Sequence, residues 1–74
     1  MTVQEVKDND GAIVTIKMDS GNETGKLVKC KGSALFEHVR DEHLTKSNEA
    51  LCWILNTEQK PLYFNIDKLE LHND

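Results

Sequence analysis

The sequence predicts an α+β domain with the element order β-β-α-β-β(-β), folded as an antiparallel twisted sheet or a small open barrel with one helix. Three observations support this class. Residues 12–18 and 24–31 alternate apolar and polar side chains, as half-buried strands do. The next segment changes to a helical period. Two further apolar segments then follow, at 51–55 and 62–66, separated by a polar loop.

Length and composition indicate a small acidic protein that forms a single domain, 1–74. Its 74 residues are 38% hydrophobic and 30% charged, and the net charge is −4. A chain of this length buries only about 60% of its unfolded surface, so a deep, water-excluding active site is not expected. We therefore expect no enzyme activity. Because acidic and basic side chains are interspersed, broad contact with nucleic-acid phosphates is also disfavoured.

Turn-forming residues at 8–11 and 19–22 bound the first strand, because Asn, Asp and Gly tolerate the left-handed backbone region. The ten residues at the start of the chain are polar-biased, and no helix is predicted there. The first two strands are expected to form an antiparallel hairpin. Their apolar faces are expected to hold Val14, Ile16 and Met18 on the first strand, and Val28 and Cys30 on the second.

The single predicted helix follows Ser33, which is a suitable N-cap, and ends within residues 45–48. Its apolar side chains fall within about 100° of one another on a helical wheel, which is typical of a helix that packs on a sheet. These side chains are Leu35, Phe36, Val39 and His43.

Residues 51–55 are interpreted as a strand. The alternative is a second helix, with Ser47 capping residues 48–55. A strand is favoured because the run is short, apolar on both faces and followed by an aromatic-rich segment. Since aromatic side chains bury the most apolar area, Trp53 is expected at the centre of the core. The chain is then expected to continue with a bend at residues 67–68 and a short strand at 69–71.

Cys30 and Cys52 are interpreted as reduced core thiols of a cytoplasmic protein. Secreted domains of this size usually carry more cysteines and begin with a signal peptide. The N-terminal residues of this sequence do not show the pattern of a signal peptide. The longest apolar run is only five residues, so no membrane span is expected.

No metal, cofactor or catalytic site is predicted. The candidate ligands do not occur at the spacing of a zinc site. They are Cys30, His38, His43, Cys52 and His72. A nucleophilic pair of one cysteine with His43 is conceivable, but a reactive thiolate needs a partly exposed, electropositive setting. Both cysteines lie in strand patterns that indicate burial.

Two charged surfaces are candidate binding sites. Glu37, Asp41 and Glu42 form an acidic helix face that can dock on a protein partner with a basic surface. The alternative is a nucleic-acid face on the first hairpin, where stacking on an aromatic side chain would be needed. Its residues are Lys26, Lys29 and Lys31, with Tyr63, whose position in the strand alternation favours exposure.

The strand and turn at residues 15–21, TIKMDSG, and the closing segment at 63–69, YFNIDKL, resemble small Sm-like or SH3-like regulators, in particular the acidic bacterial inhibitors of the Rho terminator. That family places a helix before the first strand and has none between the second and third strands, so the predicted order differs at both points. The resemblance implies that an acidic protein of this build can act by occluding the surface of a partner.

These observations together favour a small non-enzymatic binding module. We expect a regulatory protein of the accessory or inhibitor kind common in phages and mobile elements, which acts through protein–protein contact. The alternative is a small β-barrel that binds RNA or single-stranded DNA through its lysine-rich hairpin.

Overall fold

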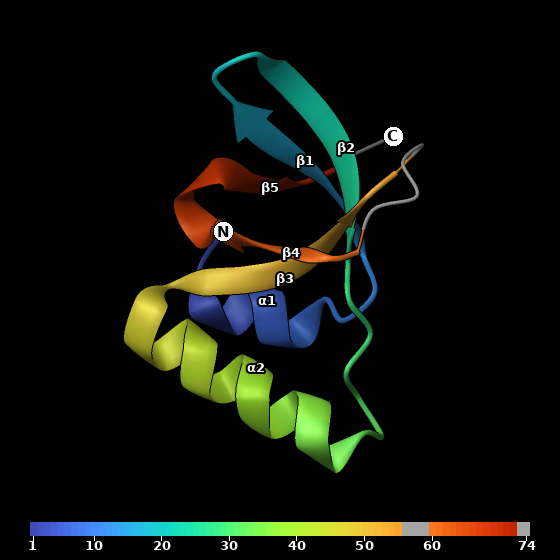
Figure 1. Ribbon diagram of the computed structural model, residues 1–74, viewed down its shortest axis with the longest axis vertical. Helices are drawn as coiled ribbons and strands as arrows, with labels where there is room; N and C mark the ends of the chain where they lie inside the picture. Colours follow the sequence, from blue (N-terminus) through green and yellow to red (C-terminus); the bar gives the residue numbers. More distant parts are fainter. Residues whose placement is uncertain (56–59, 73–74) are drawn as a thin grey trace.

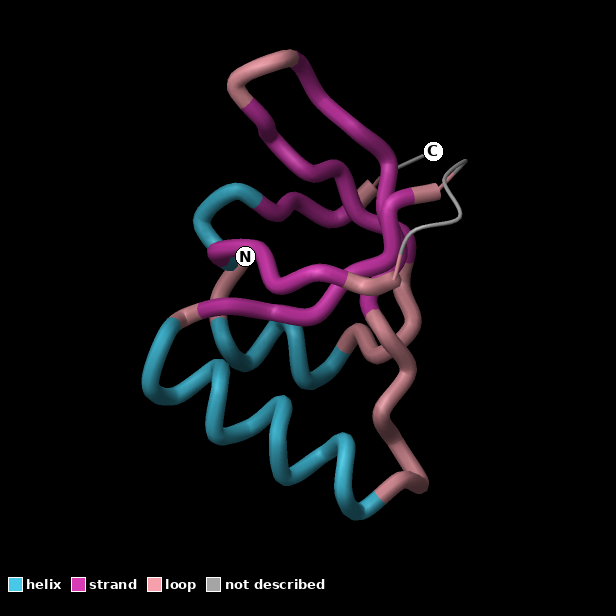
Figure 2. The backbone as a smooth tube through the Cα atoms, viewed as in Figure 1, coloured by secondary structure: helices cyan, strands magenta, loops and turns pink. Residues whose placement is uncertain are grey.

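The computed structural model of the protein describes residues 1–55 and 60–72. Five antiparallel strands curl into a half-barrel sheet in the order β4-β3-β2-β1-β5, and the helices α1 and α2 lie together at one end of it (Figures 1 and 2). The strands are β1 (Ile13–Met18), β2 (Gly21–Leu27), β3 (Glu49–Ile54), β4 (Leu62–Asn65) and β5 (Leu69–Leu71). The helices are α1 (Val3–Asp8), the main helix α2 (Ala34–Ser47) and the 3-10 turn η1 (Ile66–Lys68). The predicted α+β class and the order of its strands and main helix are confirmed.

The helix α1 was not predicted, and it forms because its first turn is well capped. The Thr2 hydroxyl accepts a hydrogen bond from the Glu5 amide, and a Glu5 carboxylate oxygen accepts one from the Thr2 amide. This capping box offsets the polar bias of the segment. Val6 is fully buried in the core, with Met1 and Val3 packed beside it.

The β1–β2 hairpin is confirmed, but β2 ends at Leu27 rather than continuing to residue 31. Gly25 allows β2 to lie close to its neighbours, since an added Cβ would stand 2.6 Å from the Ile16 side chain and 2.7 Å from the Trp53 carbonyl oxygen. Beyond Leu27 the chain leaves the sheet. The amides of Cys30 and Lys31 then donate to the Asp10 carboxylate instead of to a strand.

Aliphatic side chains, and not Trp53, form the centre of the core. Residues 51–55 do form a strand, within β3, yet Ala50 and Cys52 face the interior while Trp53 faces outward and is 42% exposed. Successive side chains of a strand point to opposite faces, so burial of Ala50 and Cys52 places Trp53 on the outer face. The largest fully buried side chains are Val6, Val14, Ile16, Leu27, Leu44, Cys52 and Leu69.

The apolar stripe predicted for the main helix does not face the core. In α2 only Arg40 and Leu44 are buried, whereas Leu35 is 73% exposed and Phe36 53% exposed. The prediction was wrong because periodicity assigns a charged residue to the solvent side. Here a charged side chain, Arg40, is instead the one directed inward.

Arg40 is directed inward because it forms a buried ion pair with Asp10. The side chains of these two residues are only 7% and 13% exposed. The Arg40 guanidinium also donates to the carbonyl oxygens of Val28, at 3.0 Å, and Val6, at 2.9 Å. One side chain of α2 therefore binds α1, the loop after it and the connection between β2 and α2.

Asp10 completes this arrangement by accepting hydrogen bonds from the backbone. The Cys30 amide lies 2.9 Å and 3.1 Å from the two carboxylate oxygens, and the Lys31 amide lies 2.9 Å from one of them. Burial is the largest influence on the pKa of Asp10 and would raise it. The hydrogen bonds from Cys30, Lys31 and Arg40 together outweigh burial and hold this pKa below its ordinary value of 3.8.

We predict that Asp10→Asn lowers the free energy of unfolding by about 3 kcal/mol at pH 7, because it leaves a buried guanidinium without its counter-charge. The contribution of the ionised carboxylate is present above pH 3.8 and is lost as the pH falls through the lower pKa of the folded state. The difference in the free energy of unfolding between wild type and Asp10→Asn, measured with urea, should therefore shrink as the pH falls below 3.8.

Asp41→Asn is the matched control, since Asp41 also pairs with a cation but its side chain is 59% exposed. This change should cost less than about 1 kcal/mol. Equal losses in the two variants, or a difference independent of pH, would contradict a dominant role for the buried pair.

Candidate binding surface

The acidic residues predicted to bind a partner are exposed on α2 but do not form one continuous face. Asp41 lies 3.4 Å from the Lys7 ammonium of α1, and Glu42 lies 2.7 Å from the ammonium of Lys46. Glu37 lies on the same side as Asp41, toward α1. The structure therefore divides the predicted acidic surface between two sides of the helix and pairs two of its three carboxylates.

A cleft of about 300 Å³ lies between α1, α2 and the connection that precedes α2. Its walls carry as many acidic as basic side chains. They are Lys7, Asp10, Cys30, Lys31, Glu37, Arg40 and Asp41. Asp10 and Arg40 are already bound to each other, and Cys30 is buried. The cleft thus presents no base beside an accessible nucleophile and no excess of one charge.

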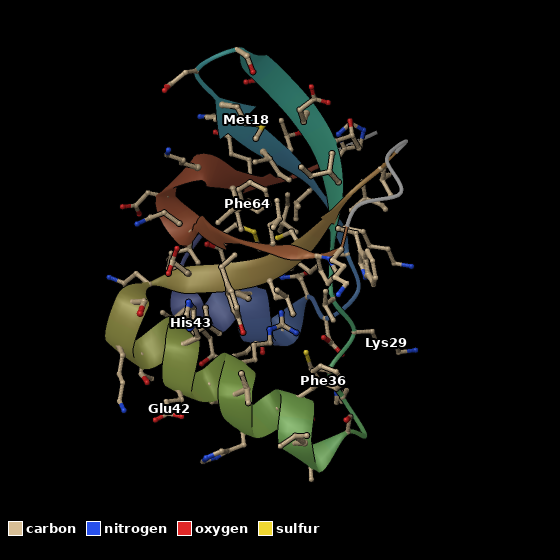
Figure 3. The ribbon with its side chains drawn as sticks, viewed as in Figure 1. Met18, Lys29, Phe36, Glu42, His43 and Phe64 are labelled. Atoms are coloured by element: carbon tan, nitrogen blue, oxygen red, sulfur yellow. The ribbon has the colours of Figure 1, made fainter. Side chains whose placement is uncertain are left out.

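The lysines predicted to bind nucleic acid are also separated. Lys26 lies on β2, directly opposite Trp53 of β3. Lys29 and Lys31 lie on the connection to α2, and Lys31 lines the cleft described above. Figure 3 shows the Lys29 side chain directed away from the sheet. Of the three lysines, Lys26 is the one that the strand register pairs with an exposed aromatic side chain.

Tyr63 was expected to be exposed, but it is half-buried beneath His43. The two rings stack with their centroids 3.7 Å apart, and the imidazole Nε2 lies 2.9 Å from a Glu49 carboxylate oxygen. These contacts join the C-terminal half of α2 to β3 and β4, and Figure 3 shows His43 between the helix and the sheet. One face of the Tyr63 ring is therefore unavailable to a ligand.

The most prominent exposed apolar feature is one side of α2, which we call the α2 flank and define as Leu35, Phe36 and Val39. The exposed fractions are 73%, 53% and 40%. Val39 lies four residues after Leu35 and three after Phe36, spacings that are adjacent on a helix surface, so the three side chains form one patch centred on Val39. The helical period of the sequence predicts these side chains to share one face, but the prediction that this face packs in the core is wrong.

A second exposed feature crosses the convex side of the sheet. Trp53 of β3, Lys26 of β2 and Ile13 of β1 are successive register partners, so their side chains form one row, which we call the outer row. Trp53 is 42% exposed and Ile13 is 37% exposed. No pattern in the sequence predicts this row, because the strand register decides which residues lie opposite one another.

Both thiols are free and buried, as predicted. Burial raises the pKa of Cys52 to about 12, which keeps its thiol protonated and unreactive at neutral pH. Among residues 1–55 and 60–72, the His, Cys, Asp and Glu side chains form no group of three or more that could hold a metal ion.

Comparison with known proteins gives no relative: no protein family, curated protein or solved structure matches the chain significantly. None of the helices in the described part of the chain has the length and apolar character needed to cross a membrane. The α2 flank and the outer row are the two exposed surfaces with the apolar character of a binding site among the described residues.

We predict that Trp53→Ala lowers the free energy of unfolding by less than about 2 kcal/mol, because a partly exposed side chain leaves no closed cavity when truncated. Leu44→Ala, at a fully buried position, should cost about 2 to 5 kcal/mol. Urea unfolding of the two variants measures the contrast. A loss for Trp53 as large as that for Leu44 would place the indole in the core.

Proposed function

We propose that the protein is a non-enzymatic module that binds another protein through the α2 flank. The single observation that carries this proposal is the exposure of Leu35, Phe36 and Val39 side by side on the main helix. Isolated exposed apolar residues are ordinary, but a contiguous patch on a small domain is typical of an interaction surface.

The size of the flank indicates a modest interface. Burying each of its side chains contributes about 1 to 3 kcal/mol, and only the surplus over the cost of association appears as affinity. A standard interface buries about 800 Å² on each partner, more than three side chains supply. The flank is therefore suited to the apolar centre of an interface whose polar rim comes from neighbouring residues.

The rim beside the flank favours a partner with basic side chains around an apolar centre. Glu42 follows Val39 on the solvent side of α2, and its side chain is 51% exposed (Figure 3). Glu37 and Asp41 lie on the opposite side of the helix and add negative potential at longer range. Such charges mainly raise the association rate and select among partners.

The mode of action that we propose is occlusion, in which the protein covers a surface that its partner needs. This agrees with a small cytoplasmic regulator of the accessory or inhibitor kind. The support is the resemblance to acidic Sm-like regulators, together with the balanced charges of the cleft and the inert Cys52 thiol.

We predict that Val39→Glu weakens partner binding at least about tenfold, because it places a charge at the centre of an apolar contact. His38→Glu adds the same charge at an adjacent exposed position outside the flank and should change binding less than about twofold. Affinity capture with wild type and both variants identifies partners that only Val39→Glu loses, and titration with the purified partner then measures the affinities.

Circular dichroism should show that both variants remain folded. As a separate single variant, Glu42→Lys should also weaken binding of the partner, and it should reduce the dependence of that binding on salt. If no captured protein distinguishes Val39→Glu from His38→Glu, the α2 flank is not the binding surface and the proposal is wrong.

A further inference from the structure

We propose that the outer row, Trp53, Lys26 and Ile13, is a second binding site, separate from the α2 flank, and that it takes single-stranded nucleic acid. The proposal does not depend on the protein-binding function. It rests on three features of the row: an exposed aromatic ring, an adjacent lysine and acidic neighbours that are already paired.

The strand register places the stacking surface and the cation side by side. Trp53 and Lys26 are direct partners in the antiparallel β2–β3 pair, and Lys26 is in turn the partner of Ile13 in β1. Side chains of direct partners leave the same face of a sheet about 5 Å apart. A base stacked on the Trp53 indole would therefore bring its phosphate within reach of the Lys26 ammonium.

The local charge is more favourable to a phosphate than the net charge of −4 suggests. Glu70, on the same face, lies 2.5 Å from the Lys17 ammonium, and Glu49 is bound by His43. Within residues 1–55 and 60–72, neither Lys26 nor Lys29 has a carboxylate partner at ion-pair distance. Among the described residues, the charge placed opposite Trp53 by the strand register is thus the Lys26 ammonium, which has no carboxylate partner.

The chemistry of the row favours a single strand over other anions. A phosphorylated peptide or an inorganic polyanion would use the lysine but would leave the indole without a stacking partner. In a duplex the faces of the bases are stacked on each other, whereas a single strand presents them to an aromatic side chain. Ile13 extends the apolar surface beyond Lys26.

The expected affinity is low, because one aromatic ring and few lysines are involved. Dissociation constants of about 10⁻⁴ to 10⁻⁶ M at physiological salt are typical of non-specific binding of this kind. The affinity should increase at low salt, with a slope corresponding to about one or two phosphate contacts.

The chain has one tryptophan, so its fluorescence reports directly on this site. We predict that an oligothymidylate of about 12 nucleotides quenches the fluorescence saturably at low salt, through stacking on Trp53. Inorganic polyphosphate, which has no bases, should produce little quenching. Lys26→Gln should weaken the binding about threefold to tenfold, while Lys46→Gln, on α2, should leave it unchanged.

Fluorescence anisotropy of a labelled oligonucleotide tests Trp53 itself. Trp53→Ala should weaken binding about tenfold, and Trp53→Phe, which keeps an aromatic face, should weaken it less. The inference is wrong if the oligonucleotide does not quench, if polyphosphate quenches equally, or if Lys26→Gln and Lys46→Gln behave alike.

Val39→Glu separates this inference from the proposed function. It should weaken protein binding at least about tenfold and leave oligonucleotide binding unchanged, because the α2 flank and the outer row share no residue. Loss of oligonucleotide binding in Val39→Glu would contradict an independent site. Failure of the protein capture alone would leave the nucleic-acid site intact.

Discussion

The buried ion pair between Arg40 and Asp10 determines how the helices sit on the sheet. Arg40 binds the carboxylate of Asp10 and the carbonyl oxygens of Val6 and Val28, and Asp10 binds the amides that begin the connection to α2. Replacing a buried ion pair by apolar residues of similar shape is often neutral for stability, so such a pair is better explained by the orientation it selects. Here it selects which side of α2 faces inward.

That orientation explains the exposed α2 flank. A helix with the periodicity of α2 could be turned so that Leu35, Phe36 and Val39 cover the sheet. The bonds of Arg40 require the helix to present Arg40 and Leu44 instead, and His43 stacks on Tyr63 at the edge of the contact. Apolar side chains that a stability argument would bury are thereby available to a partner.

Sequence reasoning predicted the elements of the sheet better than the direction in which their side chains face. The strands around Val14, Cys52 and Leu69 were located because apolar alternation marks a strand, whichever face is buried. In β3, however, both faces are apolar, so the burial of Cys52 and exposure of Trp53 depend on tertiary packing that no local pattern records. The α1 helix did have a local signal, since Thr2 and Glu5 have capping-box spacing.

The candidate surfaces were predictable only in part, for the same reason. Glu42 and Lys26 were identified as exposed charges, yet their neighbours follow from tertiary contacts. Lys26 lies beside Trp53 through the strand register, and Val39 lies outside the core through the orientation set by Arg40. Helical periodicity gives the wrong buried face for α2 because Arg40, a charged residue, is directed inward. Its partner, Asp10, is thirty residues away in the chain, so no local pattern indicates the pair.

Amide hydrogen exchange at Cys30 and Lys31 tests most directly whether the Arg40–Asp10 pair organises the helical end of the molecule. In the wild type these two amides should be protected, although they lie outside every strand and helix. In Arg40→Lys, which keeps the charge but cannot make the same set of bonds, their exchange should accelerate at least about tenfold, while amides of β1 and β2 keep their protection. Rates at Cys30 and Lys31 that match those of wild type, or that rise only together with those of β1, would contradict the account.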